Sequence, residues 1–362
     1  MADPATQSST AGGYIRQYHS TEIVDSHTAI VHLSRPYAAF LEVLAQGFLG
    51  IESPQALARP RDLNCQAPVG SGPFRIVSWD RQNKIVFDRN NAYHWAPPTA
   101  LHDGPAYLEH VEWRFIPEPS ARFAAVQAAE VDAIDSLPPE AETPARHNAD
   151  LWVLMADRPG NPTNGTLNIR RAPFNDQLAG WTTKDADGIR KRNGQRLTVH
   201  IPLRASLSNS ERTLWEQVQA TARETGFDVL LENADDTSVN AREGQWDYDV
   251  RVGYWNTNTA DVLRIVFSSE FLGAAGIAGH HQNESGFSNP EFDRIVNAAL
   301  LTTDSEQRRD LYYQAQKIVS AAFLQITTYP QTTRLAISKR VHDIRLEPSL
   351  NVTTLYDAWV EQ

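Results

Sequence analysis

The sequence predicts a mixed α/β protein with at least two lobes, and three observations lead to this prediction. A chain of 362 residues exceeds what one hydrophobic core usually supports, so two domains are expected from size alone. The N-terminal third shows the two-residue periodicity of strands, whereas later segments show the spacing of amphipathic helices. A middle segment combines both patterns in strand–helix–strand order.

The N-terminal third is expected to be rich in strands. A hairpin is predicted over residues 72–90, because apolar residues alternate with polar ones on both sides of a polar turn at 80–83. A further strand over 111–115 leads to a short helix with Ser120 as the expected N-cap, and a strand over 131–134 follows.

The middle of the chain reads as a strand–helix–strand unit. Strands over 197–201 and 227–231 flank a helix that begins with a capping box formed by Ser208 and Glu211. A third strand over 249–254 completes the expected parallel sheet with its right-handed crossover. Open parallel sheets bind ligands beyond the carboxyl ends of their strands, which directs attention to the residues after this third strand.

Two helices and closing strands are predicted in the C-terminal part. Asn289 precedes a helix with one apolar face, and Thr303 and Glu306 form a second expected capping box before the next helix. Strands are expected over 326–337 and 344–346. The apolar faces of these helices are predicted to be core.

Composition excludes several classes of function. The net charge of −11 disfavours nucleic acid as a partner, because counterion release needs clustered Lys and Arg. Cys65 is the only cysteine, so an intramolecular disulfide and a multi-cysteine metal site are excluded. The chain begins without a recognisable signal peptide or lipidation cysteine, and it contains no apolar run long enough for a membrane span.

The sequence contains no catalytic or cofactor-binding motif with the required residues and spacing. Cys65 lacks the local signatures of a nucleophile, and the string Gly70–Ser71–Gly72 has the spacing of a tight turn and not of a nucleophile elbow or phosphate loop. The adjacent His280 and His281 are expected to point to opposite faces of an extended segment, so together they do not make a two-ligand metal site, although one of them could reach a bound ligand or metal. We therefore expect no enzyme activity, no cofactor and no metal site.

The segment after the third strand differs in kind from these. Tyr254 and Trp255 are followed by Asn256 and, after further neutral polar residues, by Asp261. Aromatic walls, neutral hydrogen-bonding groups and one carboxylate are what a polar organic ligand or a peptide amine needs. The alternative is a polar loop lying over a core tryptophan.

Several strings, taken in order, resemble the family 5 extracellular solute-binding proteins, the peptide, dipeptide and nickel binders of bacterial ABC importers. They are PVGSGPFRIVSW with RNNAYHW, AAVQAAEVDAI, PFND, GWTTKDADGIRKRNGQRLTVHI, NESGFSNPEFDRIVNAAL and RRDLYYQAQKIV. Any one of them is weak, but their common order is specific. The resemblance runs from about Thr21 to Trp359.

The resemblance implies a two-lobed, peptide-binder-like fold of the type II periplasmic-binding-protein class that closes on its ligand. We expect a strand-rich N-terminal lobe over 1–170, a second α/β lobe over 171–265, and C-terminal helices and strands over 266–362 that return to the first lobe. It also implies that Tyr254, Trp255, Asn256 and Asp261 contact the ligand, with Asp261 pairing with an amino group. Asn168 and Asn283 are further ligand-binding candidates by the same resemblance.

The sequence departs from the family pattern in three places. By this resemblance, we expect the chain to be shortened at its N-terminus and again after Asp176, where the family usually has a long helical stretch. Val262 follows Asp261 where the family commonly has proline. Ala129 stands where the family commonly has glycine at a helix end, and a left-handed backbone there would cost on the order of 1 kcal/mol.

The sequence thus predicts the substrate-binding component of an ABC transporter that captures a short peptide or similar polar organic solute in a cleft between lobes. The expected partners are that solute and the transporter permease, the expected location is the periplasm or cell surface, and a monomer is expected. Two other readings stay open: a shortened scaffold reused as a cytosolic enzyme, and a truncated remnant that binds nothing.

Overall fold

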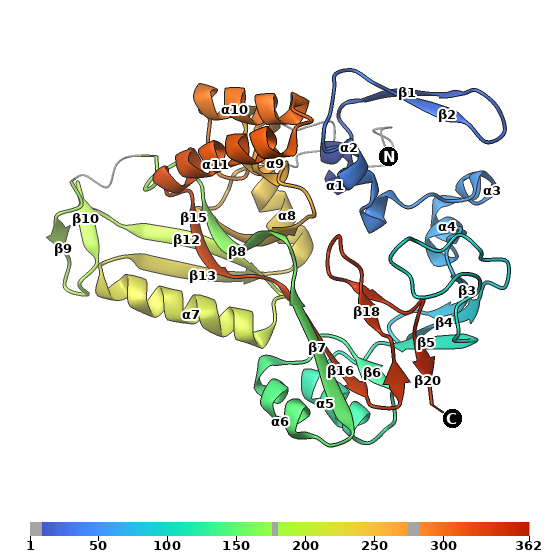
Figure 1. Ribbon diagram of the computed structural model, residues 1–362. Coiled ribbons are helices and arrows are strands. Elements are labelled where there is room, and N and C mark those ends of the chain that lie inside the picture. The colour runs from blue at the N-terminus through green and yellow to red at the C-terminus, as the bar shows by residue number, and fades with distance from the viewer. Residues whose placement is uncertain (1–8, 176–179, 274–281, 362) are drawn as a thin grey trace. The chain divides into compact units, whose positions relative to one another are not determined.

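The computed structural model describes residues 9–175, 180–273 and 282–361, and the chain forms two compact units (Figure 1). The first unit comprises Met1–Leu44 and Gly160–Tyr329, and the second comprises Ala45–Pro159 and Pro330–Gln362. The expected boundaries near 170 and 265 both fall inside the first unit. The N-terminal segment also joins that unit, since the Ala38 N–H donates to the carbonyl oxygen of Leu300 at 2.8 Å.

The first unit contains a three-stranded antiparallel sheet and a parallel pair. Strand β8 (Gly160–Leu167) lies between β14 (Val250–Asn256) and β15 (Gln325–Tyr329), in antiparallel register with both. The parallel pair is β12 (Thr198–Arg204) with β13 (Asp228–Ala234), which confirms the predicted strand–helix–strand unit. The third strand was expected to extend this parallel sheet, but β14 pairs with β8 in antiparallel register. Just before β14, the Asp249 N–H donates to the His200 carbonyl oxygen of β12 at 3.0 Å.

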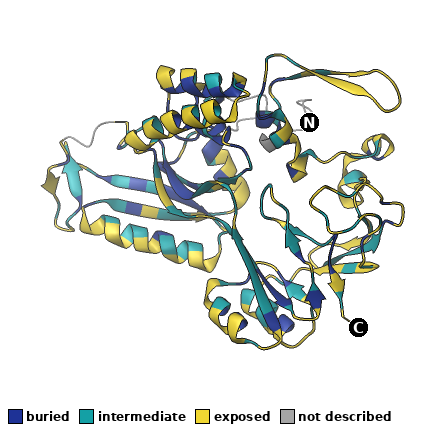
Figure 2. Ribbon diagram, in the orientation of Figure 1, coloured by how far each residue is buried: buried dark blue, intermediate teal, exposed yellow. Residues whose placement is uncertain are grey.

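Helix α7 (Asn209–Glu224) connects the two parallel strands. Its capping box is formed as predicted, with the Ser208 hydroxyl accepting from the Glu211 N–H and the Glu211 carboxylate accepting from the Ser208 N–H. Trp215 is fully buried against the strands, whereas the outer face of the helix is exposed (Figure 2). Gly226 follows the helix with φ +97°, as expected for a residue just beyond a helix C-terminus.

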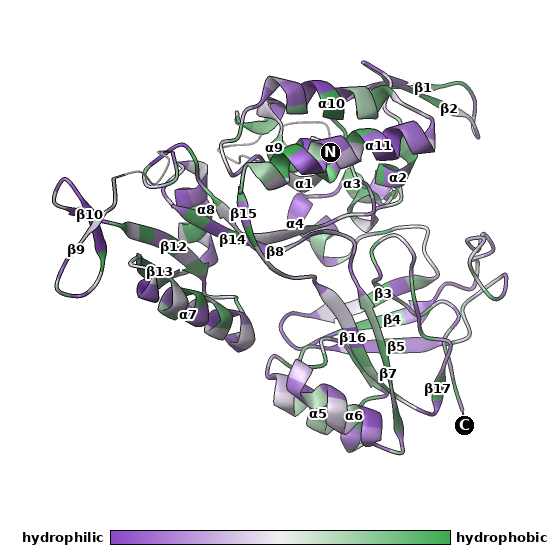
Figure 3. Ribbon diagram, turned by 60° about the vertical axis from the view of Figure 1, so that its left-hand side comes forward, coloured by the Kyte–Doolittle hydropathy of each residue, from purple (hydrophilic) through white to green (hydrophobic). Residues whose placement is uncertain are grey.

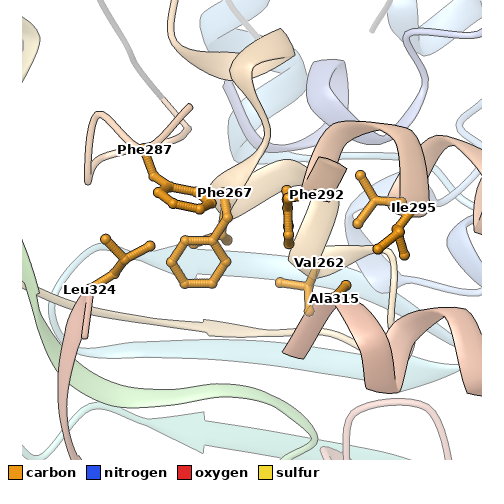
Figure 4. Close-up of a cluster of buried hydrophobic side chains, with 9 residues drawn as sticks. Val262, Phe267, Phe287, Phe292, Ile295, Ala315 and Leu324 are labelled. Carbon is orange, nitrogen blue, oxygen red and sulfur yellow. The ribbon is translucent and has the colours of Figure 1, made fainter. Parts of the chain in front are cut away.

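Three helices and an apolar cluster form the other half of the first unit. Helices α9 (Val262–Phe267), α10 (Pro290–Leu301) and α11 (Ser305–Ala321) pack around Phe267, Phe287 and Phe292 (Figure 4). Helix α9 is hydrophobic along most of its length (Figure 3), and five of its six residues are buried. The predicted cap at Asn289 is confirmed, because its side chain accepts from the Glu291 and Phe292 N–H groups.

The second unit is built from small sheets. Strands β3 (Phe74–Asp80), β4 (Lys84–Arg89) and β5 (His110–Arg114) form an antiparallel meander that includes the predicted hairpin. Strand β16 (Thr332–Ser338) lies between β6 (Ala133–Ile134) and β7 (Leu151–Asp157). Two short pairs complete the strands of this unit: β17 (Val341–His342) with β20 (Trp359–Val360), and β18 (Arg345–Leu346) with β19 (Thr353–Thr354).

The remaining elements are short. In the first unit they are α1 (Ser9–Tyr14), β1 (Tyr18–Ile23), β2 (Ala29–Leu33), α2 (Phe40–Leu44), β9 (Thr183–Lys184), β10 (Arg190–Arg192), β11 (Gln195–Arg196), α8 (Asp236–Gly244) and the 3-10 helix η4 (Ser269–Phe271). In the second unit they are the 3-10 helices η2 (Gly47–Leu49) and η3 (Pro139–Ala141) and helices α3 (Pro54–Leu57), α4 (Arg61–Gln66), α5 (Pro119–Gln127) and α6 (Glu142–His147).

Two predicted helix caps are wrong. Helix α5 begins at Pro119 after Glu118, so Ser120 lies inside its first turn. Helix α11 is capped by Asp304, whose side chain accepts from the Gln307 N–H, and not by Thr303. A carboxylate one residue away from a threonine competes for the same N–H groups and also complements the helix dipole, which explains the second error.

The strain expected at Ala129 is present, since this residue has φ +56° just beyond helix α5. Replacing Ala129 by Gly should therefore raise the free energy of unfolding by about 1 kcal/mol, because glycine adopts this conformation without a Cβ clash. Its neighbour Ala128 has φ −83° and serves as the matched control. Ala128→Gly should lower the free energy of unfolding in the same urea titration, and stabilisation by both variants would contradict the explanation.

Candidate functional site

Strand β14 and the loop that follows it contain four of the six sequence-predicted ligand residues, and the loop rests on a buried ion pair. Asp261 and Arg264 are both completely buried, and the guanidinium meets the carboxylate through two hydrogen bonds of 2.9 and 2.8 Å. The Tyr37 hydroxyl donates to the same carboxylate at 2.9 Å, and Tyr312 approaches it at 3.5 Å. Both carboxylate oxygens are therefore occupied by groups of the protein itself.

Burial and charge at this cluster act together on its titratable groups. Burial raises the pKa of Tyr37, and the neighbouring Asp261 charge raises it further. Burial alone would lower the pKa of Arg264, but the Asp261 charge outweighs this and raises it. The second Arg264 contact is Glu270, at 2.9 Å. Glu270 also pairs with Arg35 at 3.3 Å, so the cluster binds the N-terminal segment to the loop.

The six predicted ligand residues divide into two groups. Asp261, Asn168 and Asn283 are completely buried. The Asn168 amide donates to the Trp246 and Tyr248 carbonyl oxygens, and the Asn283 amide donates to those of Ser268 and Phe287. The hydrogen bonds of these three side chains are thus made to groups of the protein itself.

Tyr254, Trp255 and Asn256 lie on β14 itself. Trp255 is half-buried, donates its indole N–H to the Tyr14 hydroxyl at 2.5 Å, and packs against the apolar cluster of the first unit. The register of β14 with β8 is irregular between Gly253 and Trp255, where Tyr254 lies. Tyr254 is 51% exposed, whereas Asn256 is partly buried.

Asn258 is a polar residue that the sequence reasoning did not single out. Its amide donates to the Glu42 carbonyl oxygen at 2.7 Å, whereas its Oδ1 is buried and has no hydrogen-bond partner in the parts of the chain that the structure describes. A buried acceptor without a partner is costly. The only sequence signal was its place in the polar loop, and several neighbours share that signal.

A pocket of about 260 Å³ opens beside this loop within the first unit. Thr259 and Ala260 of the loop line it together with Tyr312 and Tyr313 of α11. Glu42 and Arg308, which form an ion pair at 2.6 Å, line it too.

A second buried charge network holds the start of β14 in place, through Arg251. Arg251 pairs with Glu284 at 3.0 Å and with Glu243 at 3.2 Å, and Arg204 pairs with Glu243 at 2.7 Å. A side chain at Gly253 would overlap the Arg251 guanidinium, so glycine is required there for this packing. Burial raises the pKa of Glu284 to about 7, although the Arg251 charge acts in the opposite direction.

No group of three or more His, Cys, Asp or Glu side chains that could hold a metal ion occurs in the described ranges. His280 and His281 lie outside the described residues. Cys65, on α4, is exposed. No helix among the described residues is long and apolar enough to cross a membrane.

Comparison with known proteins supports the family resemblance. The model of the bacterial extracellular solute-binding proteins, family 5 Middle, matches residues 1–178, just under half of the chain. The resemblance inferred from the ordered strings is thereby confirmed.

Curated relatives extend the match along the chain. The probable D,D-dipeptide-binding periplasmic protein DdpA of Escherichia coli is 26% identical, over 91% of this chain and 72% of DdpA. The glutathione-binding protein GsiB of Escherichia coli is 27% identical, over 88% of this chain and 69% of GsiB. The chain thus spans between two thirds and three quarters of the length of these two relatives.

Solved structures share the fold. NikA from Brucella suis in complex with Fe(III)-EDTA has a TM-score of 0.78 and 18% identity, covering 96% of this chain and 80% of NikA. The oligopeptide-binding protein AppA from Bacillus subtilis in complex with a nonapeptide has a TM-score of 0.79 and 16% identity, covering 99% of this chain and 82% of AppA. The expected α/β fold class of periplasmic binding proteins is confirmed.

The buried ion pair predicts a structural role for Asp261. Asp261→Asn should lower the free energy of unfolding by about 3 kcal/mol, because it leaves the buried Arg264 charge without its main partner. The matched control is Asp310→Asn on the exposed face of α11, where the carboxylate pairs with Arg309 in solvent and the change should be slight. Equal stability of the two variants in urea titrations would contradict this role.

The Glu284 network predicts a specific pH dependence. A folded-state pKa of about 7, above the ordinary value of a glutamate, favours the protonated carboxyl in the folded protein. The stability that Glu284 contributes is therefore fully present below pH 4.5 and is lost as the pH rises through 7. Glu284→Gln cannot ionise, so the unfolding free energy of the natural protein relative to this variant should fall by about 3 kcal/mol over that range. A constant or rising difference would contradict the assignment.

Proposed function

We propose that this chain is the solute-binding component of an ABC importer and that its solute is a short peptide or a related polar organic molecule. The observation that carries the proposal is the match to the family together with the names of the relatives, since DdpA and GsiB are by name binders of a D,D-dipeptide and of glutathione. Both are small peptides. The oligopeptide-binding protein AppA, a structural neighbour, holds a nonapeptide.

The exposed part of β14 fits this proposal. Tyr254 offers an exposed aromatic face, and Asn256, two residues further along the strand, carries an amide that both donates and accepts hydrogen bonds. Such groups recognise peptide bonds without requiring a charged ligand. Asp261 is not assigned to a ligand amine in this proposal, because its oxygens are held by Arg264 and Tyr37.

The relatives named above are binding proteins and not enzymes. We propose accordingly that the solute leaves this protein chemically unchanged and passes to a transporter permease. DdpA is a periplasmic protein by name, and the periplasm is the proposed site of action here. A monomer is the form proposed for this role, and sedimentation of the purified protein tests it.

Calorimetric titration tests both the proposed class of solute and the role of Tyr254. The natural protein should bind at least one member of a panel of di- to pentapeptides that includes D-Ala-D-Ala and glutathione. Tyr254→Ala should then weaken binding by about tenfold, because an aromatic contact of about 1.4 kcal/mol is lost.

The control for that experiment is Tyr313→Ala, which removes a similarly exposed tyrosine from α11 in the same unit. It should leave the affinity unchanged. Loss of affinity in this variant alone would move the solute to the pocket beside α11 and contradict the role of Tyr254. Absence of binding by the intact, cooperatively folding protein would contradict the proposed function and favour the remnant hypothesis.

A further inference from the structure

The charge network at the start of β14 links Glu284 to the strand that carries Tyr254. Arg251 of β14 pairs with Glu284 at 3.0 Å and with Glu243 of α8 at 3.2 Å. Glu243 also pairs with Arg204 of β12 at 2.7 Å, so this carboxylate is shared between two guanidinium groups. Both glutamates are buried, and all members of the network belong to the first unit.

The Arg251 guanidinium lies against the backbone immediately before Tyr254. A Cβ atom at Gly253 would overlap its Nη1 and Cζ atoms, so the guanidinium occupies the space that a side chain would need there. The register between β14 and β8 is irregular from Gly253 to Trp255, so a regular ladder does not fix Tyr254. The position of Arg251 therefore affects the backbone from which the exposed Tyr254 ring projects.

The backbone around Glu284 is held from two sides. The Tyr248 hydroxyl donates to the Glu284 carbonyl oxygen at 2.7 Å, and the Ile169 N–H donates to the Ser285 carbonyl oxygen at 2.9 Å. Because these contacts fix the segment, a change in the charge of the Glu284 carboxyl acts on Arg251 and does not move the segment itself.

Charged and titratable groups face the Glu284 carboxyl from four segments of the first unit. They are Arg204 of β12, Glu243 of α8, Tyr248 ahead of β14, and Arg251 on β14 itself. The guanidinium groups of arginines do not lose their proton in proteins. Burial raises the pKa of Tyr248, and the Glu284 charge raises it further, so the Tyr248 hydroxyl stays neutral.

The Glu284 carboxyl, in contrast, changes its charge near neutral pH. Burial raises its pKa to about 7, although the Arg251 charge acts in the opposite direction. Above pH 7 the ionised carboxylate pairs with Arg251. Below pH 7 the neutral carboxyl no longer balances the guanidinium, and Glu243 is then the carboxylate that both Arg251 and Arg204 share.

We propose that Glu284 is a pH-sensitive positioning residue of the solute site. Its ionised carboxylate holds Arg251 against Gly253, and its protonation releases Arg251 and loosens the strand at Tyr254. A loosened contact surface must be ordered when a solute binds, so binding weakens as the pH falls through 7. The effect on solute binding rests on the proposed function, whereas the effect on the strand does not.

Hydrogen exchange in the solute-free protein tests the effect on the strand. The β14 amides that bond to β8 should have protection factors about fivefold lower at pH 5.5 than at pH 8, relative to the amides that join β8 to β15. Global stability cannot produce this result, because the contribution of Glu284 to the free energy of unfolding rises as the pH falls. Glu284→Gln is neutral at every pH and should show the lower protection at both.

Calorimetric titration tests the effect on solute binding. Each peptide of the panel that binds, D-Ala-D-Ala and glutathione included, is titrated into the natural protein and into Glu284→Gln at pH 5.5 and pH 8. The two proteins should bind equally at pH 5.5, and the natural protein should bind about fivefold more tightly at pH 8. Titration of the solute itself cancels in this comparison. The matched control Glu216→Gln removes an exposed carboxylate from α7 and should keep the pH dependence of the natural protein.

Three results would overturn the inference. They are equal protection of the β14 amides at the two pH values, a Glu284→Gln variant that retains the pH dependence of the natural protein, and a natural-to-variant affinity ratio that does not change with pH. Absence of binding by every peptide contradicts the proposed function instead, and the exchange experiment still decides whether Glu284 acts on the strand. If Glu284→Gln does not unfold cooperatively, the exchange of the natural protein decides by itself.

Discussion

The first unit depends on the buried ion pair between Asp261 and Arg264. Two charges taken out of water need complementary partners, and here they find each other together with Tyr37, Tyr312 and Glu270. These partners come from three parts of the chain that are far apart in sequence. The ion pair therefore fixes the loop after β14, the N-terminal segment and helix α11 against one another, whereas apolar packing alone would tolerate small shifts between them.

Because of this constraint, the polar side chains of β14 and its loop fall into a buried group and an exposed group. Side chains whose hydrogen bonds are made inside the protein give the loop its shape, and the proposed recognition of a solute falls to groups such as Tyr254 that remain exposed. A site held in this way would need little rearrangement on binding, so less of the interaction energy would be lost to ordering. The charge network of Arg251, Glu243 and Glu284 likewise holds β14 in place through ion pairs within the protein.

Local signals in the sequence predicted local structure in part. The capping box of Ser208 and Glu211 and the cap at Asn289 were foreseeable, because each depends on neighbours within a few residues, whereas the left-handed backbone at Ala129 was suggested by the family resemblance. The caps expected at Ser120 and Thr303 were wrong. The ordered motifs also led to the family and its fold. The antiparallel partner of β14 was not foreseeable, since β8 lies about 90 residues earlier in the chain.

The roles within the site could be predicted only in part. The sequence shows that Asp261 is a carboxylate in a polar loop, but not that Tyr37, from the start of the chain, reaches it. Asn168 and Asn283 illustrate the same limit, since an asparagine that holds carbonyl groups and one that holds a ligand look alike in a sequence. Burial decides between these roles, and burial is a property of the whole fold.

Hydrogen exchange of the backbone amides around Asp261 tests most directly whether the protein itself fixes this loop. The Arg264 and Ile265 N–H groups donate to the Asp261 carbonyl oxygen. In the solute-free protein these amides should exchange as slowly as those of the central strand β8, and saturating solute should change their rates little. Fast exchange in the free protein that becomes slow only with bound solute would contradict this account and return Asp261 to a role in ligand binding.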